Sequence, residues 1–279
     1  MLSQFLPEDF NPQDKLAVLA GKGVYPQILV EKLRELKIPT CLMALEGETA
    51  PELIESFDKS DVEIFNIGQL GRLLKELKKH GAANAMMAGQ ITPKKLFKGL
   101  KLDLKAMMIL ATLKRRNAET IFGAIADQMA KIGVRLLDAR CFLDDCIAPK
   151  GFFCGKKWNI SQSDLEHGMT IAREMARLDV GQGCVVSHGS VLAVEAWEGT
   201  DKMLERAGEF EAKDCLFAKT VKPNQDYRFD VPVIGERTVR KLAASHIENV
   251  AVEAGKVIIL EKEKVAALAN QNNIKIYGI

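Results

Sequence analysis

The sequence predicts an α/β protein with an N-terminal Rossmann-like parallel-sheet domain and a C-terminal mixed α+β domain. Three observations support this fold class. Short aliphatic runs alternate with amphipathic stretches in the first third of the chain, and every such run ends near a glycine. A Pro- and Gly-containing stretch near the middle of the 279 residues is typical of a boundary between domains.

Four aliphatic runs are the predicted strands, namely Leu16–Ala20, Thr40–Leu45, Val62–Ile67 and Ala85–Ala88. Between them, apolar residues at helical spacing predict helices over Tyr25–Leu36, Ala50–Phe57 and Leu70–His80. This order requires parallel strands joined by right-handed crossovers. The glycines that follow the strands are Gly21, Gly47, Gly68 and Gly89. They are expected at the carboxyl edge of the sheet, where doubly wound folds bind ligands.

The rest of the chain is predicted in less detail. A long helical region is expected from about Leu100 to Ile132, and a strand over Val134–Leu143. Asp144–Cys154 is the expected linker, which gives a nucleotide-binding domain over 1–143 and a second domain over 144–279. In the second domain, Ser163 is expected to cap a helix that ends near Leu178. A hairpin is predicted around His188-Gly189, and further helices near Glu236–His246 and Glu263–Asn270.

The composition narrows the functional classes. With 47% hydrophobic and 27% charged residues, the chain can form a buried core and is not intrinsically disordered. A net charge of +2 and only 6% aromatic residues give no support for nucleic-acid binding. The start of the sequence lacks a secretory signal, and the longest apolar run is shorter than the roughly 20 residues of a spanning helix. Six cysteines without a C-x-x-C pair are expected to be buried thiols of a cytoplasmic protein.

The first candidate ligand-binding turn follows the first predicted strand. Gly21, Lys22 and Gly23 precede Tyr25, which is also expected to contact the substrate, and Pro26, since proline is favoured where a helix begins. Such a turn lets a phosphate approach the backbone at a helix N-terminus, and Lys22 would add positive charge. Glu46 ends the second strand, where dinucleotide-binding folds place an acid for the ribose. The alternative is an ordinary tight turn, because Pro26 replaces the third glycine of G-x-G-x-x-G.

Two further turns at the same predicted edge are candidates for the nucleotide. They contain Gly68, Gln69 and Leu70 in one case and Gly89 and Gln90 in the other. The glutamine amides suit hydrogen bonds to uracil or ribose. Each turn taken alone favours a structural role over a ligand-binding one, whereas three glycine-bearing turns on one edge favour a nucleotide site.

A basic segment from Lys94 to Arg116 interleaves positive and apolar residues. Its cations are Lys94, Lys95, Lys98, Lys101, Lys105, Lys114, Arg115 and Arg116, against the single acid Asp103. A basic amphipathic helix suits an anionic membrane surface. A solvated face on a helix that packs against the core explains the pattern equally well.

Two motifs in the second half offer catalytic groups. Glu195 follows a predicted strand and precedes Gly199, Thr200 and Asp201, which form either an anion-binding turn or a simple helix cap. Downstream, an extended chain would place Asp226, Arg228 and Asp230 on one face, close to Lys222 and Gln225. Carboxylates that hold a divalent cation, together with cations that grip phosphoryl oxygens, suit phosphoryl transfer. A salt-bridge ladder on an edge strand is the alternative.

Taken together, these blocks resemble the UDP-2,3-diacylglucosamine pyrophosphatase family of lipid A synthesis, the one unrelated to the metallophosphoesterases. The resemblance runs from Lys15 to near the end of the chain and rests on the order of several motifs. These are Leu19–Gly23 with Pro26, Leu45–Gly47, Gly68–Gly71, Met87–Gly89, Leu178–Gln182, Ala193–Asp201, Lys222–Asp230 and Val252–Gly255. The sequence departs from the family at Lys22, where glycine or alanine is common, and in the leader Met1–Asp14.

The resemblance implies a nucleotide-binding first domain and a second domain that holds the diacyl sugar. It implies hydrolysis of UDP-2,3-diacylglucosamine to UMP and 2,3-diacylglucosamine 1-phosphate, with Mg²⁺ or Mn²⁺ as cofactor. The family's critical aspartate maps onto Asp226, so we expect Asp226 and Asp230 to bind the metal. Lys222 and Arg228 would neutralise phosphate charge and Glu195 would assist.

Partners and rival functions follow from the same residues. Transient contact with the inner membrane surface is expected, nucleic acid is not, and a homodimer is compatible with the sequence. One rival is an NAD-dependent oxidoreductase, suggested by the Gly21 turn and Glu46. Another is a non-catalytic nucleotide- or lipid-binding protein that uses the basic segment. Neither rival gives the Asp226 motif a role.

Overall fold

The computed structural model describes residues 2–91, 102–114 and 117–279. The chain forms two compact units. Unit 1 contains Met1–Asp144 together with Asp226–Asp230, and unit 2 contains Asp145–Gln225 and Val231–Ile279. The chain therefore passes between the units three times. We call the segment Asp226–Asp230 the Asp226 loop, since it interrupts the sequence of unit 2 but packs in unit 1.

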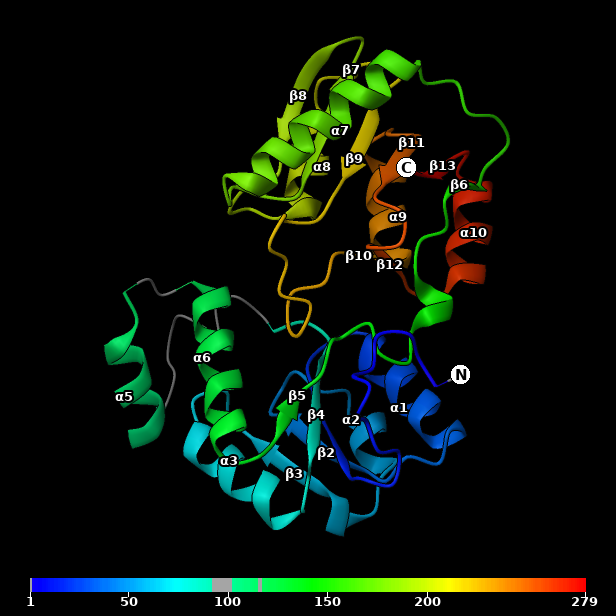
Figure 1. The fold of residues 1–279 in the computed structure, drawn as a ribbon. Coiled ribbons are helices and arrows are strands. Elements are labelled where there is room, and N and C mark those ends of the chain that lie inside the picture. The colour runs from blue at the N-terminus through cyan, green and yellow to red at the C-terminus, as the bar shows by residue number, and fades with distance from the viewer. Residues whose placement is uncertain (1, 92–101, 115–116) are drawn as a thin grey trace. The chain divides into compact units, whose positions relative to one another are not determined.

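Unit 1 is built on a parallel sheet with the strand order β3-β2-β1-β4-β5. The strands are β1 (Leu16–Ala20), β2 (Thr40–Leu45), β3 (Val62–Phe65), β4 (Asn84–Ala88) and β5 (Arg135–Leu136). The helices are α1 (Tyr25–Glu35), α2 (Pro51–Glu55), α3 (Leu70–Lys79), α5 (Leu104–Thr112) and α6 (Ala118–Lys131), with a 3-10 turn, η1, at Lys59–Asp61. In Figure 1, α1 and α2 cover one face of the sheet and α3 and α6 the other. This doubly wound arrangement confirms the Rossmann-like prediction.

Alternation along the strands explains why both faces of this sheet are covered. Leu16, Val18 and Ala20 are buried, and so is Ala17, which points to the opposite face. Apolar residues on both faces are typical of a parallel sheet between helix layers. Ala17 belongs to a cluster with side chains of α3 and α6, including Leu77 and Met129. The helix layers therefore fix the sheet, and the strand ends present the turns that concern function.

The later part of unit 1 confirms one prediction and contradicts another. The helical region expected from about Leu100 to Ile132 contains α5 and α6 in its described residues, and the side chains of Asp103 and Asn117 cap these two helices. The strand expected over Val134–Leu143 is limited to β5, after which the chain turns at Asp138. Much of the predicted basic segment lies outside the described residues, including Lys94, Lys95, Lys98, Lys101, Arg115 and Arg116.

Unit 2 has a six-stranded mixed sheet with the order β6-β13-β11-β9-β7-β8. Its strands are β6 (Gly151–Cys154), β7 (Gly183–Ser187), β8 (Ser190–Val194), β9 (Leu216–Lys219), β11 (Asn249–Val252) and β13 (Lys275–Gly278). A two-stranded ladder joins β10 (Val233–Ile234) to β12 (Ile258–Ile259). The helices are α7 (Gln162–Arg177), α8 (Thr200–Gly208), α9 (Glu236–Ala244) and α10 (Lys262–Gln271), and a 3-10 turn, η2 (Asp144–Cys146), spans the first passage between units. The prediction of a mixed α+β second domain is confirmed.

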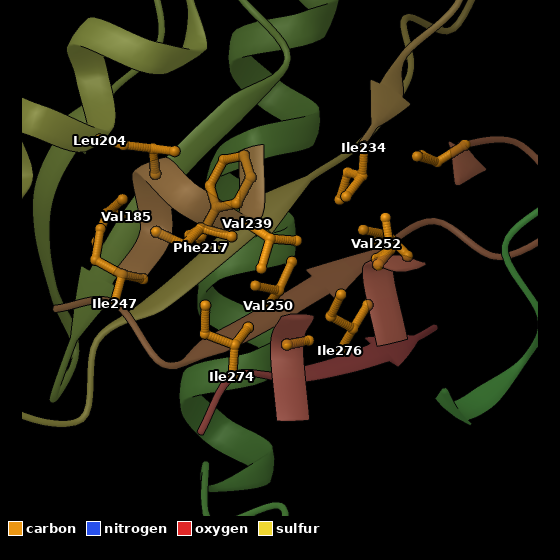
Figure 2. Close-up of a cluster of buried hydrophobic side chains, with 14 of the residues drawn as sticks. Val185, Leu204, Phe217, Ile234, Val239, Ile247, Val250, Val252, Ile274 and Ile276 are labelled. Atoms are coloured by element: carbon orange, nitrogen blue, oxygen red, sulfur yellow. The ribbon is translucent and has the colours of Figure 1, made fainter. Parts of the chain in front are cut away.

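The main core of unit 2 lies on the face of this sheet that α8, α9 and α10 cover. Figure 2 shows Phe217 of β9 surrounded by aliphatic side chains of this cluster, with Val239 from α9 and Val250 from β11 among them. Phe217 is fully buried. Met169 of α7 belongs to a separate cluster with Leu216, the residue next to Phe217 on β9. Successive β9 residues therefore contact opposite helix layers, which makes β9 a rigid support for the residues that follow it.

Three local predictions in unit 2 have different outcomes. The hairpin is confirmed, with positive φ at His188 and Gly189 between β7 and β8. The expected linker Asp144–Cys154 contains β6, which pairs with β13 as an edge strand. The cap of α7 is Ser161 rather than Ser163, since the Ser161 hydroxyl accepts a hydrogen bond from the Asp164 amide at 3.0 Å. No helix among the described residues has the length and apolar content needed to cross a bilayer.

Candidate functional site

The first glycine turn packs directly on the turn after β4. The Lys22 amide donates to the Gln90 carbonyl at 2.7 Å, and the Gln90 amide donates to the Lys22 carbonyl at 2.9 Å. A Cβ atom on Gly21 would lie 2.5 Å from the Gln90 carbonyl oxygen, and one on Gly89 would lie 2.7 Å from that of Lys22. Both glycines are therefore required for the close approach of two backbones. Gly21 and Gly89 therefore have the structural role that the sequence leaves open beside ligand binding.

Gly23 differs from the other glycines of this edge. Its φ is +100°, a conformation that favours glycine, and nothing lies within 4 Å of the place that a Cβ atom would occupy. Lys22 and Gly23 are both exposed, and α1 begins two residues later with Pro26 in its first turn. Of the predicted phosphate-binding turn, Lys22 and Gly23 are thus the residues that a ligand can reach. Gln90 is exposed beside them.

Two acids follow β2, and the buried one is Glu48, whereas the sequence predicts Glu46 as the ribose-binding acid. Glu46 is exposed, whereas Glu48, in the same turn after β2, has only 6% of its surface accessible. Thr49 ties this turn to the first, because its hydroxyl donates to the Ala20 carbonyl. Glutamates are rarely buried unless they are paired or have a function, and a buried acid in a candidate site is a functional candidate. Glu48 is therefore a candidate that sequence reasoning missed, although the Glu-Gly-Glu pattern marks it.

The turn before α3 is filled by a side chain of the protein itself. The Asp103 carboxylate accepts hydrogen bonds from the Gly71 amide at 2.6 Å and the Arg72 amide at 3.4 Å. The Gln69 side chain accepts from the Asn66 amide at 3.0 Å, and Leu70 is buried in the core. The carbonyl of Gly68 accepts from the Asp103 amide. An internal carboxylate thus occupies the helix N-terminus that the sequence offered to the nucleotide.

The Asp226 loop is held in unit 1 by backbone and aromatic contacts. The Ala139 amide donates to the Tyr227 carbonyl at 2.8 Å, and the Arg140 guanidinium lies 3.5 Å from the centroid of the Tyr227 ring. On the far side of the loop, the ring centroids of Phe229 and Phe122 of α6 are 5.8 Å apart. These contacts fix the backbone on both sides of Arg228.

The same network reaches the first glycine turn. The Tyr25 hydroxyl donates to the Ala139 carbonyl, so Ala139 receives one bond from α1 and gives another to Tyr227. Tyr25 is buried, and its hydrogen bond to Ala139 connects the start of α1 to the Asp226 loop. It is a positioning residue for this loop, and its contact with substrate stays a prediction.

Asp226 and Arg228 form a two-pronged ion pair within this loop. Arg228 donates from Nε at 2.9 Å and from a terminal nitrogen at 2.6 Å, one bond to each carboxylate oxygen. The hydrogen bonds from Arg228 hold the pKa of the Asp226 carboxyl below its usual range. The pKa of Arg228 is raised in turn, first by Asp226 and further by the charge of Asp127 on α6. Asp226 is therefore an oriented, ionised carboxylate near neutral pH.

The extended conformation assumed for this motif is wrong. Residues 223–224 and 227–229 form turns, so Asp226, Arg228 and Asp230 do not share one face of a strand. The Asp230 amide instead donates to the Asp226 carbonyl at 3.1 Å, which closes one helical turn. The reason is the pair of prolines at positions 223 and 232, together with the bond from the Arg228 amide to the Asp226 carboxylate. The motif is a compact loop.

The donor set of the Asp226 loop fits Mg²⁺ in one respect. Among the described residues of unit 1, one cluster of three side chains has metal-ligand spacing, and it consists of Glu63, Glu76 and His80. Asp226 does not form a cluster of this kind with other described residues. Mg²⁺ commonly binds proteins through one or two carboxylates and completes its shell with water and phosphate oxygens. The carboxylates of Asp226 and Asp230 would supply this number of protein ligands.

A second group of polar residues lies at one end of the unit 2 sheet. The Lys219 ammonium, at the end of β9, is 3.6 Å from a Glu195 carboxylate oxygen and 3.1 Å from the Thr200 hydroxyl. Thr200 in turn donates to Glu195 at 2.7 Å. The side chains of Lys219 and Glu195 are only 8% and 15% exposed. A buried charge pair of this kind is rarely kept for stability, because desolvation offsets most of the attraction.

The neighbouring strand adds a further acid to this end of the sheet. Glu253 follows β11 and accepts hydrogen bonds from the Thr220 hydroxyl at 2.5 Å and from Lys256 at 2.7 Å. Lys219 and Glu253 are functional candidates that sequence reasoning did not assign. Their signal was position, since each stands at the carboxyl end of one of two adjacent parallel strands.

The remaining predicted residues of unit 2 have structural partners. Lys222 pairs with Asp179 at 2.6 Å, and the Gln225 side chain accepts from the Lys222 amide at 2.9 Å. Asp201 pairs with Arg237. Gly199 precedes α8 with a φ of +80° and open space around it, which is compatible with the predicted anion-binding turn.

We expect Gly21→Ala to lower the free energy of unfolding by about 1–3 kcal/mol, because the new methyl group overlaps the Gln90 carbonyl. The matched control is Gly123→Ala in the middle of α6, where nothing lies within 4 Å and alanine should stabilise by about 0.5–1 kcal/mol. Chemical denaturation followed by circular dichroism measures both. Equal stability of Gly21→Ala and the wild type would mean that the two turns are not packed as described.

We expect Lys219→Met to destabilise unit 2 by about 3 kcal/mol, because Glu195 is left as a buried charge without its cation. The double variant Lys219→Met/Glu195→Gln should regain most of this loss. Both tryptophans, Trp158 and Trp197, lie in unit 2, so their fluorescence during urea unfolding reports on this unit. If the loss of stability in the double variant equals the sum of the losses in the two single variants, Lys219 and Glu195 do not interact as a charge pair.

Comparison with known proteins places the chain in a family. Residues 15–146 match the model of the LpxI N-terminal domain, and residues 149–277 match that of the LpxI C-terminal domain. The chain is also 30% identical over 278 residues to a Caulobacter vibrioides protein named UDP-2,3-diacylglucosamine pyrophosphatase LpxI, an alignment that covers 95% of this chain and 97% of the relative. The two matched domains follow one another along almost the whole sequence, and the chain belongs to the LpxI family.

Proposed function

We propose that this chain hydrolyses the pyrophosphate bond of UDP-2,3-diacylglucosamine in lipid A synthesis. UMP and 2,3-diacylglucosamine 1-phosphate would be the products. The name of the Caulobacter vibrioides relative supports the substrate, since the alignment spans both domains. The observation that carries the chemistry is the Asp226–Arg228 pair, an ionised carboxylate held by an arginine in a loop that several contacts fix.

The reaction has simple requirements. The oxygen of a water molecule bonds to one phosphorus, the bridging P–O bond breaks, and its electron pair leaves with the other phosphate. The site must neutralise a doubly charged diphosphate and orient the water. A bound Mg²⁺ or Mn²⁺ would supply positive charge and polarise the phosphoryl oxygens.

Each residue of the Asp226 loop has a role in this proposal. Asp226 would hold the cation, with Asp230 as a further ligand or hydrogen-bond partner. Arg228 keeps Asp226 ionised, and the partly exposed edge of its guanidinium can bind a phosphoryl oxygen. Because the pKa of Asp226 is lowered, this group suits a metal ligand better than a general base that works near pH 7.

Each unit would bind a different part of the substrate. In unit 1, Lys22, Gly23 and Gln90 are exposed at the carboxyl edge and suit the UDP portion. In unit 2, Glu195 would act as a positioning residue for Lys219 and Thr200, and Lys222 would bring positive charge to the phosphate. The diacylglucosamine portion is assigned to unit 2.

We expect Asp226→Asn to lower kcat by about 100-fold or more, since the group that holds the cation loses its charge. The assay measures UMP released from UDP-2,3-diacylglucosamine with Mg²⁺ or Mn²⁺ and with EDTA. Asp9→Asn is the matched control, because Asp9 forms a similar two-pronged pair with Arg135, at 2.6 and 2.7 Å, in the same unit. It should leave kcat unchanged.

Two results would contradict this function. One is an Asp226→Asn variant with wild-type kcat and unchanged dependence on metal. The other is a folded wild-type protein that releases no UMP with any divalent metal. Measurement of NAD(H) binding would then test the alternative function as an oxidoreductase.

The described part of the basic segment supports contact with the inner face of a membrane. Leu104, Met107 and Met108 of α5 are 71%, 48% and 60% exposed, although they are apolar. Lys105 and Lys114 are exposed nearby. Apolar side chains beside cations suit the boundary between lipid headgroups and acyl chains. We therefore assign α5 to an anionic lipid surface, which is where a diacylated substrate resides.

We expect Leu104→Gln/Met108→Gln to weaken binding to vesicles that contain phosphatidylglycerol by about tenfold or more. The reason is that two apolar side chains would no longer be buried in the lipid surface. Vesicle co-sedimentation measures this, with pure phosphatidylcholine vesicles to isolate the contribution of lipid charge. Ile64→Gln is the control, since Ile64 is an apolar residue of β3 that is 45% exposed. Unchanged binding of the double variant would exclude α5 as the contact.

A further inference from the structure

A group of three potential metal ligands lies far from the proposed reaction in the fold of unit 1. Glu63 stands near the start of β3, Glu76 is in the last turns of α3, and His80 ends that helix. One ligand atom from each lies within 4.8 Å of the others. The start of a parallel strand and the end of the helix that follows it lie at the amino edge of the sheet. The glycine turns stand at the opposite, carboxyl edge.

His80 gives independent evidence that the group has a ligand. Its side chain is only 7% exposed and its Nε2 atom is 3.6 Å from a Glu63 carboxylate oxygen. That nitrogen is buried and makes no hydrogen bond with any residue that the structure describes. Buried polar atoms in native proteins nearly always have a partner, so the atom calls for one. A cation between His80 and the two glutamates would provide it.

The protein already places a positive charge between these two carboxylates. The Lys79 ammonium is 3.2 Å from a Glu63 oxygen and 2.9 Å from a Glu76 oxygen. Hydrogen bonding from Lys79 holds the pKa of the Glu76 carboxyl below its usual range. Lys79 is nevertheless 63% exposed, so its flexible chain can swing into solvent. The C-terminal end of α3 carries a partial negative charge that also favours a cation here.

We propose that Glu63, Glu76 and His80 bind a divalent transition-metal cation of the Zn²⁺ class, with Lys79 displaced into solvent. One imidazole and two carboxylates favour such a cation over Mg²⁺ and Ca²⁺, which prefer oxygen ligands alone. Zinc bonds of about 2.0–2.2 Å require a contraction of the group that side-chain torsions can provide. Water would complete the shell. The cation would tie β3 to α3 and take no part in hydrolysis.

Four of the six cysteines are weak competitors for zinc in a binding experiment. Burial raises the pKa of Cys41 and Cys154 to about 11, and that of Cys141 and Cys184 to about 12. Since zinc binds the thiolate form, these four remain protonated and poorly available at neutral pH. Binding measured near pH 7 therefore reports mainly on other groups.

The test is calorimetric titration of the metal-free full chain with ZnCl₂ near pH 7, after circular dichroism has shown each variant to be folded. The wild type should show a saturable Zn²⁺ site that persists in Asp226→Asn, which removes the cation-binding group proposed for hydrolysis. His80→Gln and Glu76→Gln should each weaken binding by at least about tenfold. Lys79→Ala should strengthen it, because the competing ammonium is removed. His188→Gln is the control, since that imidazole is 68% exposed beside Asp214.

The outcomes separate this proposal from its alternatives. A wild-type protein without saturable zinc binding overturns it, and so do His80→Gln and Glu76→Gln variants that bind as tightly as the wild type. If Lys79→Ala binds no more tightly than the wild type, zinc does not replace the ammonium and the proposed site is wrong. UMP release should be the same for His80→Gln and the wild type, so failure of either proposal is distinguishable from failure of the other.

Discussion

The hydrogen bond from the Ala139 amide to the Tyr227 carbonyl is the contact on which the candidate active site depends. It holds a segment of the later sequence in unit 1, and Arg140 covers the Tyr227 ring beside it. Without this anchor, Asp226 and Arg228 would sit in an unsupported connection between β9 and β10. Catalytic groups work when surrounding contacts fix their geometry. The backbone bond and the stacked guanidinium provide that support, and Phe229 provides it from the other side.

The glycines illustrate how one residue type serves two purposes at a single edge. Gly21 and Gly89 let two turns pack backbone against backbone, whereas Gly23 has open space around it. The first pair builds the edge, and the third residue leaves it accessible. Likewise, Asp103 fills the N-terminus of α3 with an internal carboxylate, while the start of α1 has no side-chain cap. The protein therefore satisfies the N-terminus of α3 with its own carboxylate and leaves that of α1 without a side-chain cap.

Much of the fold could be predicted from local patterns. The first four strands and the helices of unit 1 follow from apolar periodicity, and the hairpin at His188 follows from its turn residues. The errors arise where a side chain acts over distance or a cap competes with a longer pattern. Asp103 and Asn117 cap separate helices within a stretch that the pattern predicts only as a helical region, and the cap of α7 is Ser161 instead of the predicted Ser163. Periodicity does not contain such information.

The candidate site was predictable in its residue types but not in its arrangement. Asp226 and Arg228 were identified from charge pattern and family resemblance, yet the assumed strand is a compact loop. Lys219 and Glu253 were missed because nothing in their immediate sequence marks them; their significance depends on the pairing of β9 with β11. Tyr25 was assigned to substrate, although its hydroxyl bonds a backbone carbonyl more than one hundred residues away in the chain.

The membership of the Asp226 loop in unit 1 has a consequence for how the chain is made. The ribosome synthesises Met1–Asp144 first. The Asp226 loop, which contacts Ala139 and Phe122, is synthesised only after most of unit 2. Domains usually fold in the order in which they are translated. Here the nascent first unit must keep its loop-binding surface uncovered until Asp226–Asp230 arrives. The final docking step therefore couples maturation of the candidate active site to synthesis of the second half.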